Sequence, residues 1–287
     1  MDDLTFELCA LCKRNRDGSH ASQAGRLQIL KLASQQLREA GFRQMHAKSL
    51  VGKHVDALLM RWQAEGLSPG TVKNRVACLR WWAEKVGKGS AIPADNSQLR
   101  IPERRFVTNE NKAQQLDDRL DRVHDPYVRM SLLLQQAFGL RREESIKFQP
   151  SFADRGDCIA LKSSWTKGGR FRIVPITTPE QRAVLDQAHQ LAGAGSLVPA
   201  QKTYIQQRDA YDGQCKAAGL SNMHGLRHHY AQARYKALTG YKAPAAGGPS
   251  THLLTPAQRA YDAMARQTIS QELGHERTQI TAVYLGR

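Results

Sequence analysis

Apolar residues recur at helical spacing near the start of the sequence. Over residues 22–40, Leu27, Leu30 and Leu37 follow the helical period, and Gly41 ends the pattern. Such spacing places the three leucines on one side of a helix, where they can be buried together. The pattern therefore predicts an amphipathic helix that packs on an apolar core.

Two further helices are predicted before residue 87. An apolar repeat over residues 47–65 ends at Gly66, and Ser68-Pro69 then offers an N-cap and a first-turn proline. Large aromatic side chains belong more often to a core than to a base-stacking surface, so packing is assigned to three residues: Trp62, Trp81 and Trp82. Residues 1–86 are therefore predicted to form an all-helical domain.

The pattern changes after residue 86. Residues 87–107 contain Gly, Ser and Pro without periodicity, which is typical of a linker between domains. Residues 108–287 are predicted to form a second domain, in which strands near 157–162 and 171–176 flank a turn at Gly168-Gly169. Helices are predicted near residues 126–138, 179–191, 203–218, 224–237 and 256–273. The predicted fold is mainly α with a small β-hairpin, and its second domain is of the α+β class.

The segment 240–255 interrupts this second domain. It is rich in Gly, Pro and Ala and has no apolar period, so it predicts an exposed loop.

Composition narrows the class of protein. The 287 residues are 41% hydrophobic, enough for a globular core, and no stretch approaches the roughly 18 apolar residues of a membrane span. The N-terminal residues lack the order of a signal peptide, so a cytoplasmic protein without a membrane partner is expected. The five cysteines are scattered and odd in number, which indicates reduced thiols. Cys9 and Cys12 are half of a zinc pattern with no second pair, and no metal site is predicted.

Charge points to a polyanionic partner. The formal net charge is +16, and both halves of the sequence have more basic than acidic residues. A protein that is basic in two domains suits a clamp around duplex DNA, with binding that weakens as salt rises. The alternative is that the charge serves only solubility.

Four short stretches of the second domain carry the candidate chemistry. The first has Arg141 followed by Glu144, the second is the Lys-Gly-Gly turn at Lys167, and the third is a His-x-x-Arg box. The fourth is a Leu-Gly-His triplet whose histidine precedes Tyr284 by nine positions. Each stretch alone is weak evidence of a site, but their joint occurrence in this order is specific. The box and the triplet supply three further candidates: His224, Arg227 and His275.

In order and spacing these stretches resemble the signature of the tyrosine recombinase (phage integrase) family. The resemblance covers about residues 20–287, and it implies a SAM-like N-terminal core-binding domain that closes with the catalytic domain as a C-shaped clamp. It implies that Tyr284 attacks DNA and forms a 3′-phosphotyrosyl bond. It also implies that Lys167 is the general acid and His224 the general base. Glu144 and His228 are given supporting roles.

The residue types fit this chemistry. A phosphodiester under attack gathers negative charge on its non-bridging oxygens, and the planar guanidinium groups of Arg141 and Arg227 can bind two such oxygens at once. A phenol, with a pKa near 10, needs a neighbouring base to become a nucleophile, and His224 or His275 can serve. No phosphate-binding loop or acidic cluster is present, so neither ATP, metal nor another cofactor is expected.

The resemblance also implies partners and a setting. These are double-stranded DNA with inverted half-sites, a homo-oligomer that is dimeric on each site and tetrameric in the synapse, and accessory directionality or bending factors. A bacterial-type, nucleoid-associated enzyme that integrates or excises a mobile element is expected. Basic residues outside the signature are predicted to contact DNA: Lys73, Arg75, Arg104, Arg105, Arg170 and Arg172.

Two departures from the family pattern are visible. The interval from His224 to His275 is roughly twice the usual one, so residues 240–255 are interpreted as an insertion. Few residues follow Tyr284, and coupling between protomers is expected to use other surfaces. Two alternatives remain open: a type IB topoisomerase, which shares the chemistry, and a catalytically silent DNA-binding relative.

Overall fold

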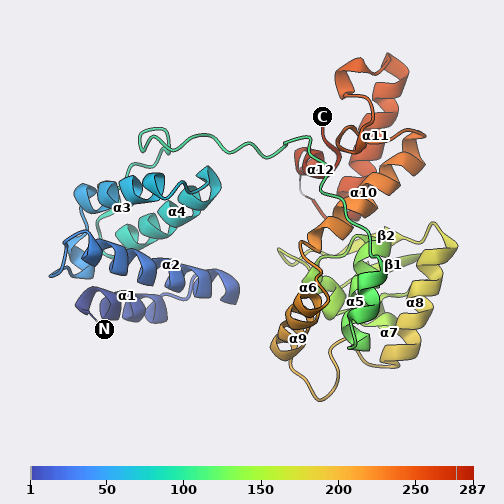
Figure 1. The fold of residues 1–287 in the computed structure, drawn as a ribbon, viewed down its shortest axis with the longest axis horizontal. Coiled ribbons are helices and arrows are strands. Elements are labelled where there is room, and N and C mark those ends of the chain that lie inside the picture. The colour runs from blue at the N-terminus through green and yellow to red at the C-terminus, as the bar shows by residue number, and fades with distance from the viewer. Residues whose placement is uncertain (1, 276) are drawn as a thin grey trace. The chain divides into compact units, whose positions relative to one another are not determined.

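The computed structural model of the protein describes residues 2–275 and 277–287. The chain divides into two compact units, the first ending at Arg105 and the second beginning at Phe106 (Figure 1). Helices dominate both units, and among the described residues the only sheet is a two-stranded hairpin in the second unit. The predicted fold class, mainly α with a small β-hairpin, is confirmed.

The first unit is a group of four helices. Its elements are α1 (Asp3–Arg14), α2 (His20–Glu39), the 3₁₀ turn η1 (Ala47–Ser49), α3 (Gly52–Ala64), α4 (Pro69–Lys85) and the 3₁₀ turn η2 (Gly89–Ala91). Helix α2 packs against the other three helices. The three helices predicted in this part of the sequence are confirmed. Helix α1 had not been predicted, although Leu4, Leu8 and Leu11 follow the helical period and are buried.

Two tryptophans fill the core of the first unit. Trp62 and Trp82 are both buried, as expected for packing residues. Each indole N–H still has a partner, because Nε1 of Trp62 donates to Gln36 Oε1 at 2.8 Å and Nε1 of Trp82 donates to the Ala47 carbonyl at 2.9 Å. Burial of these rings therefore leaves no indole donor without a hydrogen bond.

The stretch predicted to be a linker is partly packed on the first unit. Ile92, Leu99 and Ile101 are buried in its core. The guanidinium of Arg80 also donates twice to the Pro93 carbonyl, at 3.0 Å and 2.7 Å. Isolated apolar residues in a segment without periodicity are sufficient to anchor it, which is why the absence of a repeat was misleading.

The second unit contains eight helices, the hairpin and three 3₁₀ turns among the described residues. In chain order the elements are η3 (Asp118–Arg122), α5 (Pro126–Phe138), α6 (Arg142–Ile146), α7 (Pro150–Ala153), β1 (Cys158–Leu161), β2 (Arg172–Pro175), α8 (Pro179–Ala192), α9 (Tyr204–Ala217), α10 (His224–Thr239), η4 (Pro244–Ala246), η5 (Thr251–Leu253), α11 (Pro256–Glu272) and α12 (Thr278–Leu285). All predicted strands and helices of this half are confirmed. The short helices α6, α7 and α12 had not been predicted.

Helices α5 and α10 form the centre of the second unit. Helix α5 contacts α8 and α10, and α10 in turn contacts α11 and α12 (Figure 1). The strands pair antiparallel, with Cys158 opposite Pro175 and Leu161 opposite Arg172. This arrangement brings the turn before α6, the middle of α10 and the short α12 together around one apolar core.

Residues 240–255 are not the fully exposed loop that the sequence predicted. They form η4 and η5, and Ala243, Ala245 and Leu254 are buried. Small side chains let this backbone approach its neighbours closely, so a segment without an apolar period is still packed.

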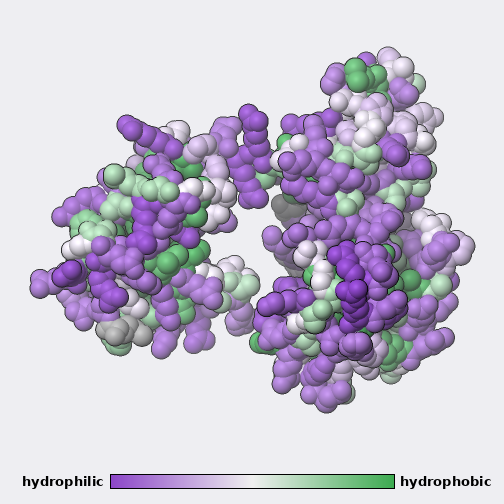
Figure 2. Space-filling model, viewed as in Figure 1, coloured by the Kyte–Doolittle hydropathy of each residue, from purple (hydrophilic) through white to green (hydrophobic). Residues whose placement is uncertain are grey.

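Figure 2 shows hydrophilic side chains over much of the visible surface of each unit, in keeping with the net charge of +16. Within the described ranges, no helix is both long enough and apolar enough to cross a membrane.

Candidate active site

The turn between α5 and α6 sets the position of Arg141. Helix α5 ends at Gly139, whose φ is +60°, and a β-carbon there would lie 2.5 Å from the Tyr230 ring. Only glycine fits this turn. The backbone N–H of Arg141 donates to Glu144 Oε2 at 2.6 Å, and its Nη1 donates to Glu144 Oε1 at 2.8 Å. The arginine is therefore fixed at the start of α6 by its own helix.

Glu144 is fully buried and also binds Arg172. Nη1 and Nη2 of Arg172 reach its two oxygens at 2.6 Å and 2.7 Å. Burial alone would raise the pKa of Glu144, but hydrogen bonds from Arg172 and the nearby arginine charges lower it to about 2. The carboxylate is therefore ionised at neutral pH and orients two guanidinium groups.

Arg172 occupies a position that differs from the sequence prediction. It was assigned to DNA contact, but its side chain is only 5% exposed and forms a buried ion pair with Glu144. In β2 the burial alternates, and Arg172 shares the inward face with Val174. An arginine on the apolar face of a predicted strand is a signal for a buried partner, and that signal was available in the sequence.

Arg227 lies in the first turn of α10 and is buried. Its guanidinium donates from Nη1 to the Gly139 carbonyl and from Nη2 to the Leu273 carbonyl, and Nη2 is 3.5 Å from His275 Nε2. Its buried Nε–H has no partner within the described part of the chain. Burial and the charge of Arg141 lower the pKa of Arg227 to about 10, so it remains protonated at neutral pH.

His224 meets Tyr284 at the start of α10. Its Nε2 is 3.1 Å from the Tyr284 hydroxyl. The residue is exposed to solvent on one side, and its ring contacts those of His228 and Tyr284 on the other. Partial burial, followed by the charges of Arg227 and Arg141, lowers its pKa. A position in the first turn of a helix acts in the same direction. A neutral imidazole beside a phenol is able to accept its proton.

Two more imidazoles contact the Tyr284 ring. The centroid of His228 is 4.4 Å from that of Tyr284, and the His275 ring stacks on it at 5.2 Å. Nδ1 of His275 is 3.0 Å from Thr281 Oγ1, a contact that the sequence did not reveal. Burial, followed by charged neighbours, lowers the pKa of His228 to about 4 and that of His275 to about 3. Tyr284 itself is buried in this cluster.

Lys167 is not brought into the cluster. It lies exposed on the turn between β1 and β2, next to Gly168 and Gly169, whose φ angles are both positive. Among the described residues it forms no hydrogen bond or ion pair with the other candidates. Thr166 closes the turn by donating to the Arg170 carbonyl at 2.6 Å. The position leaves the lysine free to meet a ligand from outside.

The predicted DNA contacts of the first unit differ in accessibility. Arg75 is mostly enclosed, since its guanidinium lies 5.3 Å from the Trp62 ring and 4.0 Å from a Glu65 oxygen. Packing therefore competes with a role in contacting DNA. Lys73 is partly exposed, and Arg104 and Arg105 are exposed beside the start of α4. Arg170, in the second unit, is also exposed.

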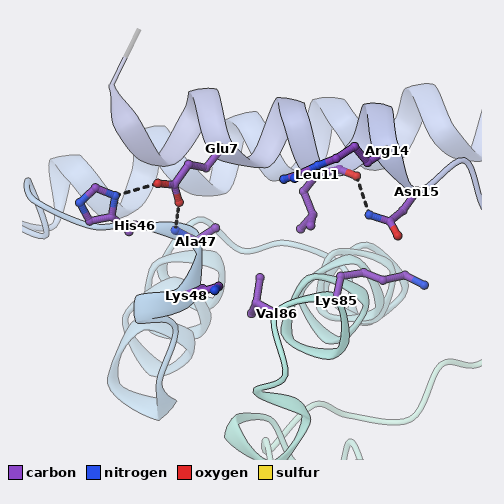
Figure 3. A pocket seen from close by; sticks show the side chains of 9 residues that line it. All are labelled: Glu7, Leu11, Arg14, Asn15, His46, Ala47, Lys48, Lys85 and Val86. Atoms are coloured by element: carbon purple, nitrogen blue, oxygen red, sulfur yellow. Dashed lines mark hydrogen bonds and ion pairs between the residues drawn. The ribbon is translucent and has the colours of Figure 1, made fainter.

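A hollow of about 820 Å³ lies in the first unit, between α1, η1 and the end of α4 (Figure 3). Glu7 closes one side of it, because its carboxylate binds the His46 ring at 2.8 Å and accepts from the Ala47 N–H at 2.6 Å. Arg14 and Lys48 are among its lining residues. None of the candidate catalytic residues lines this hollow, and all of them lie in the second unit.

Comparisons with known proteins agree with this geometry. Residues 1–91 match the family model for the N-terminal domain of phage integrases, and residues 102–233 match the model named Integrase. A comparison with curated proteins found no significant match.

Three solved structures show the same fold. A lambda integrase dimer bound to a COC′ core site is 14% identical over 99% of this chain and 96% of that chain, with a TM-score of 0.62. XerH site-specific recombinase bound to a palindromic difH substrate is 16% identical over 99% and 81%, with a TM-score of 0.60. The Tn1549 transposon integrase in complex with circular intermediate DNA is 13% identical over 100% and 96%, with a TM-score of 0.57.

Integrase models thus match both parts of the chain, and the solved structures share its fold over nearly its whole length. The chain belongs to the phage integrase family of tyrosine recombinases, enzymes that cleave and rejoin DNA strands.

Proposed function

We propose that this protein is a site-specific recombinase that cuts DNA with Tyr284 and keeps the cut end as a 3′-phosphotyrosyl bond. The observation that carries the proposal is the 3.1 Å contact between Tyr284 and His224, set beside Arg227 and His275. A phenol, a neutral imidazole and a guanidinium are the groups that this reaction needs at one place.

The first step moves two protons, one from Tyr284 and one to the leaving 5′ oxygen, and exchanges one bond. The Tyr284 oxygen attacks the phosphorus as its proton passes to His224 Nε2, and the bond from phosphorus to the 5′ oxygen breaks. In the second step the 5′ hydroxyl of a partner strand attacks the phosphotyrosine and gives its proton to the Lys167 amine, while the bond to the Tyr284 oxygen breaks and the tyrosine regains its proton from His224. The number of phosphodiester bonds is conserved, so no external energy source enters the scheme.

Guanidinium groups stabilise the charge that develops on the phosphate. Arg141 offers its partly exposed side, while Arg227 contributes its full charge and the buried Nε–H that has no other partner within the described residues. Glu144 does not contact the phosphate in this scheme. It holds Arg141 and Arg172 in place, which prepares the site before DNA binds.

Lys167 is proposed as the acid that protonates the leaving 5′ oxygen. Its exposed position on the β1–β2 turn supports this role, because a lysine held in the interior could not reach DNA. His275 is proposed to contact the phosphate, and His228 to support the ring of Tyr284.

Double-stranded DNA is the proposed substrate, held by both units. The net charge of +16 supports this, as do four accessible basic residues: Lys73, Arg104, Arg105 and Arg170. The structures of similar fold include a lambda integrase tetramer bound to a Holliday junction. We propose a dimer on each inverted pair of half-sites, a tetramer in the synapse, and integration or excision of a mobile element as the task.

A covalent-capture experiment tests the proposal without knowledge of the target site. A labelled library of nicked duplexes, randomised around the nick, is incubated with the protein and resolved in SDS. Wild type is expected to give a covalent complex, and Tyr284→Phe none. Tyr261→Phe is the matched control: Tyr261 is 55% exposed on α11, and this variant is expected to form the complex as wild type does.

A complex that persists in Tyr284→Phe would overturn the assignment. Relaxation of any supercoiled plasmid, without site preference or recombinant product, would instead indicate a topoisomerase of type IB.

A further inference from the structure

The backbone around Tyr284 is held by side chains from other elements. Gln232 in α10 donates from Nε2 to the Tyr284 carbonyl at 3.2 Å. Arg266 in α11 donates from Nη1 to the Gly286 carbonyl at 2.9 Å. Both donors come from other helices, and both acceptors are backbone carbonyls at the end of α12 or just after it. The end of α12 is therefore fixed from two neighbouring helices.

Gly286 is the point at which residues 240–255 meet this backbone. Its φ is +77°, and a β-carbon would lie 2.8 Å from the Ala245 nitrogen and 3.2 Å from Pro244 Cβ. The turn η4 thus lies directly on the glycine. Asn109 adds a contact from another side, because its Oδ1 accepts the next backbone N–H at 2.9 Å.

The segment that covers Gly286 is itself firmly built. Ala243 has no exposed surface, and Leu254 is 4% exposed. The N–H of Gly248 donates to the Ala243 carbonyl at 3.0 Å, and the backbone folds so tightly that a β-carbon on Gly248 would lie 1.7 Å from the Lys242 oxygen. Because residues 240–255 are held by their own backbone contacts, they can offer a rigid surface to Gly286.

Arg266 is anchored before it reaches Gly286. Its Nε lies 2.8 Å and 2.9 Å from the two oxygens of Asp262, one turn earlier on α11. Asp262 is 4% exposed and also accepts the hydroxyl of Tyr235 in α10. The guanidinium therefore links two core helices to the carbonyl that follows α12.

We propose that Arg266 is a positioning residue for the nucleophile, and that residues 240–255 form the surface against which it holds Tyr284. The inference rests on the proposed function. Gly286 lies two residues beyond Tyr284, so a displacement there rotates the last turn of α12 and changes the 3.1 Å contact with His224. Residues 240–255, interpreted from the sequence only as an insertion, would therefore help to position the nucleophile.

Single-turnover cleavage of a nicked duplex selected from the library tests this inference. Arg266→Gln removes the charge that links Asp262 to Gly286, and we expect the rate of covalent-complex formation to fall about 10- to 100-fold, because a shift of about 1 Å can cost this much. Affinity for DNA is expected to stay within about twofold of wild type. Arg266→Lys, which keeps a donor and a charge, should recover part of the rate.

Two controls separate positioning from general damage. Arg259→Gln, on the exposed side of α11, should cleave at the wild-type rate. A substrate with sulfur in place of the bridging 5′ oxygen loses its leaving group without protonation. Arg266→Gln should stay slow on it, since the defect lies in placing the nucleophile.

If Arg266→Gln fails to fold, Asn109→Gly tests whether contacts to the backbone after α12 position Tyr284. Asn109 is exposed with a φ of +58°, which glycine tolerates, so this variant removes only a contact to the tyrosine segment and should slow cleavage several-fold. Wild-type rates in every folded variant, or recovery of Arg266→Gln on the sulfur substrate, would overturn the inference. Absence of a covalent complex in wild type would overturn the proposed function instead.

Discussion

The two units bury very different side chains. The buried polar residues of the first unit are uncharged or weakly basic: Ser34, Gln36 and His54. The second unit buries full charges near the proposed catalytic cluster, including Glu144, Arg172 and Arg227, and a second group at Asp262 and Glu272. Since burying an ion is costly unless it is paired, this difference needs a reason beyond stability.

The difference separates a unit whose core is held by packing from one that carries the proposed catalytic cluster. In the first unit, aromatic and aliphatic side chains supply the core, and each buried indole needs only one acceptor. In the second, carboxylates hold guanidinium groups in fixed orientations around Tyr284. Preorganised charge lowers the reorganisation needed when a phosphate is attacked.

The largest effect is expected when the buried ion pair between Glu144 and Arg172 is broken. Glu144→Gln leaves Arg172 buried without its counter-ion, and we expect the second unit to lose about 3–5 kcal/mol of stability. Hydrogen exchange followed by mass spectrometry should show the loss in α5, α6 and β2, with the first unit unchanged. Glu143→Gln is the control, because its exposed pair with Lys147 contributes little. Equal effects of the two variants would contradict the comparison.

A smaller effect is expected from the core of the first unit. Trp82→Phe removes the indole donor and leaves the Ala47 carbonyl without its bond, at a cost of about 1–3 kcal/mol. Denaturant unfolding of the first unit reports the change. Trp81→Phe should cost less, because Trp81 is half-buried and binds the exposed Asp17. The cleavage rate of the covalently captured substrate should not change in either variant; a slower rate would show that this core also serves the chemistry.

Lowering the pH is expected to destabilise the second unit more than the first. The loss of stability expected from His228 is equal to or smaller than that of Trp82→Phe. The pKa of His228 is about 4 in the folded protein, against an ordinary value of 6.5. The unfolded chain therefore binds the proton more readily, and stability falls as pH drops from about 6.5 toward 4. From pH 7 to pH 5 we expect His228 alone to cost the second unit about 1–2 kcal/mol, and His275, whose pKa of about 3 is lower still, to add a loss in the same direction.

The first unit has one buried histidine, His54, and should lose less over the same range. Thermal unfolding read by hydrogen exchange at both pH values measures this. His228→Phe should reduce the pH dependence of the second unit without abolishing it, because His275 still contributes, and an unaltered slope would exclude His228 as a source.

The smallest effect concerns a helix end. Ser68→Ala removes the cap that accepts the Thr71 N–H, and we expect the first unit to lose about 1 kcal/mol. Ser68→Asp keeps an acceptor and should unfold near the wild-type midpoint in urea. A loss of equal size in both variants would mean that the cap is not the cause.

Local signals predicted most of the fold. Ser68-Pro69 marks the start of α4, where the serine accepts the N–H of Thr71 as expected. The Gly168-Gly169 turn between two short apolar runs marks the hairpin. These features act over a few residues, so the sequence carries them in full.

Features that depend on distant partners were missed. The alternation of β2 marks Arg172 as an inward-facing residue, but only the folded chain shows that its partner is Glu144, 28 positions earlier. The small residues of 240–255 show no periodicity because they pack against backbone, as Gly286 shows, and not against a helical face. The signature residues around Tyr284 could be named from their spacing, whereas the contact of Thr281 with His275 required the folded chain.

The order in which the reactive residues occur along the chain has a consequence for synthesis. The contacts that complete the site close very long intervals, with 132 positions between Arg141 and Leu273 and 178 between Asn109 and Arg287. Ribosomes release the N-terminal domain first, and long-range contacts form late in folding. Tyr284 is the last of the proposed catalytic residues to be made. We therefore expect a growing chain to acquire the basic surfaces of its first unit well before it is able to break a DNA strand.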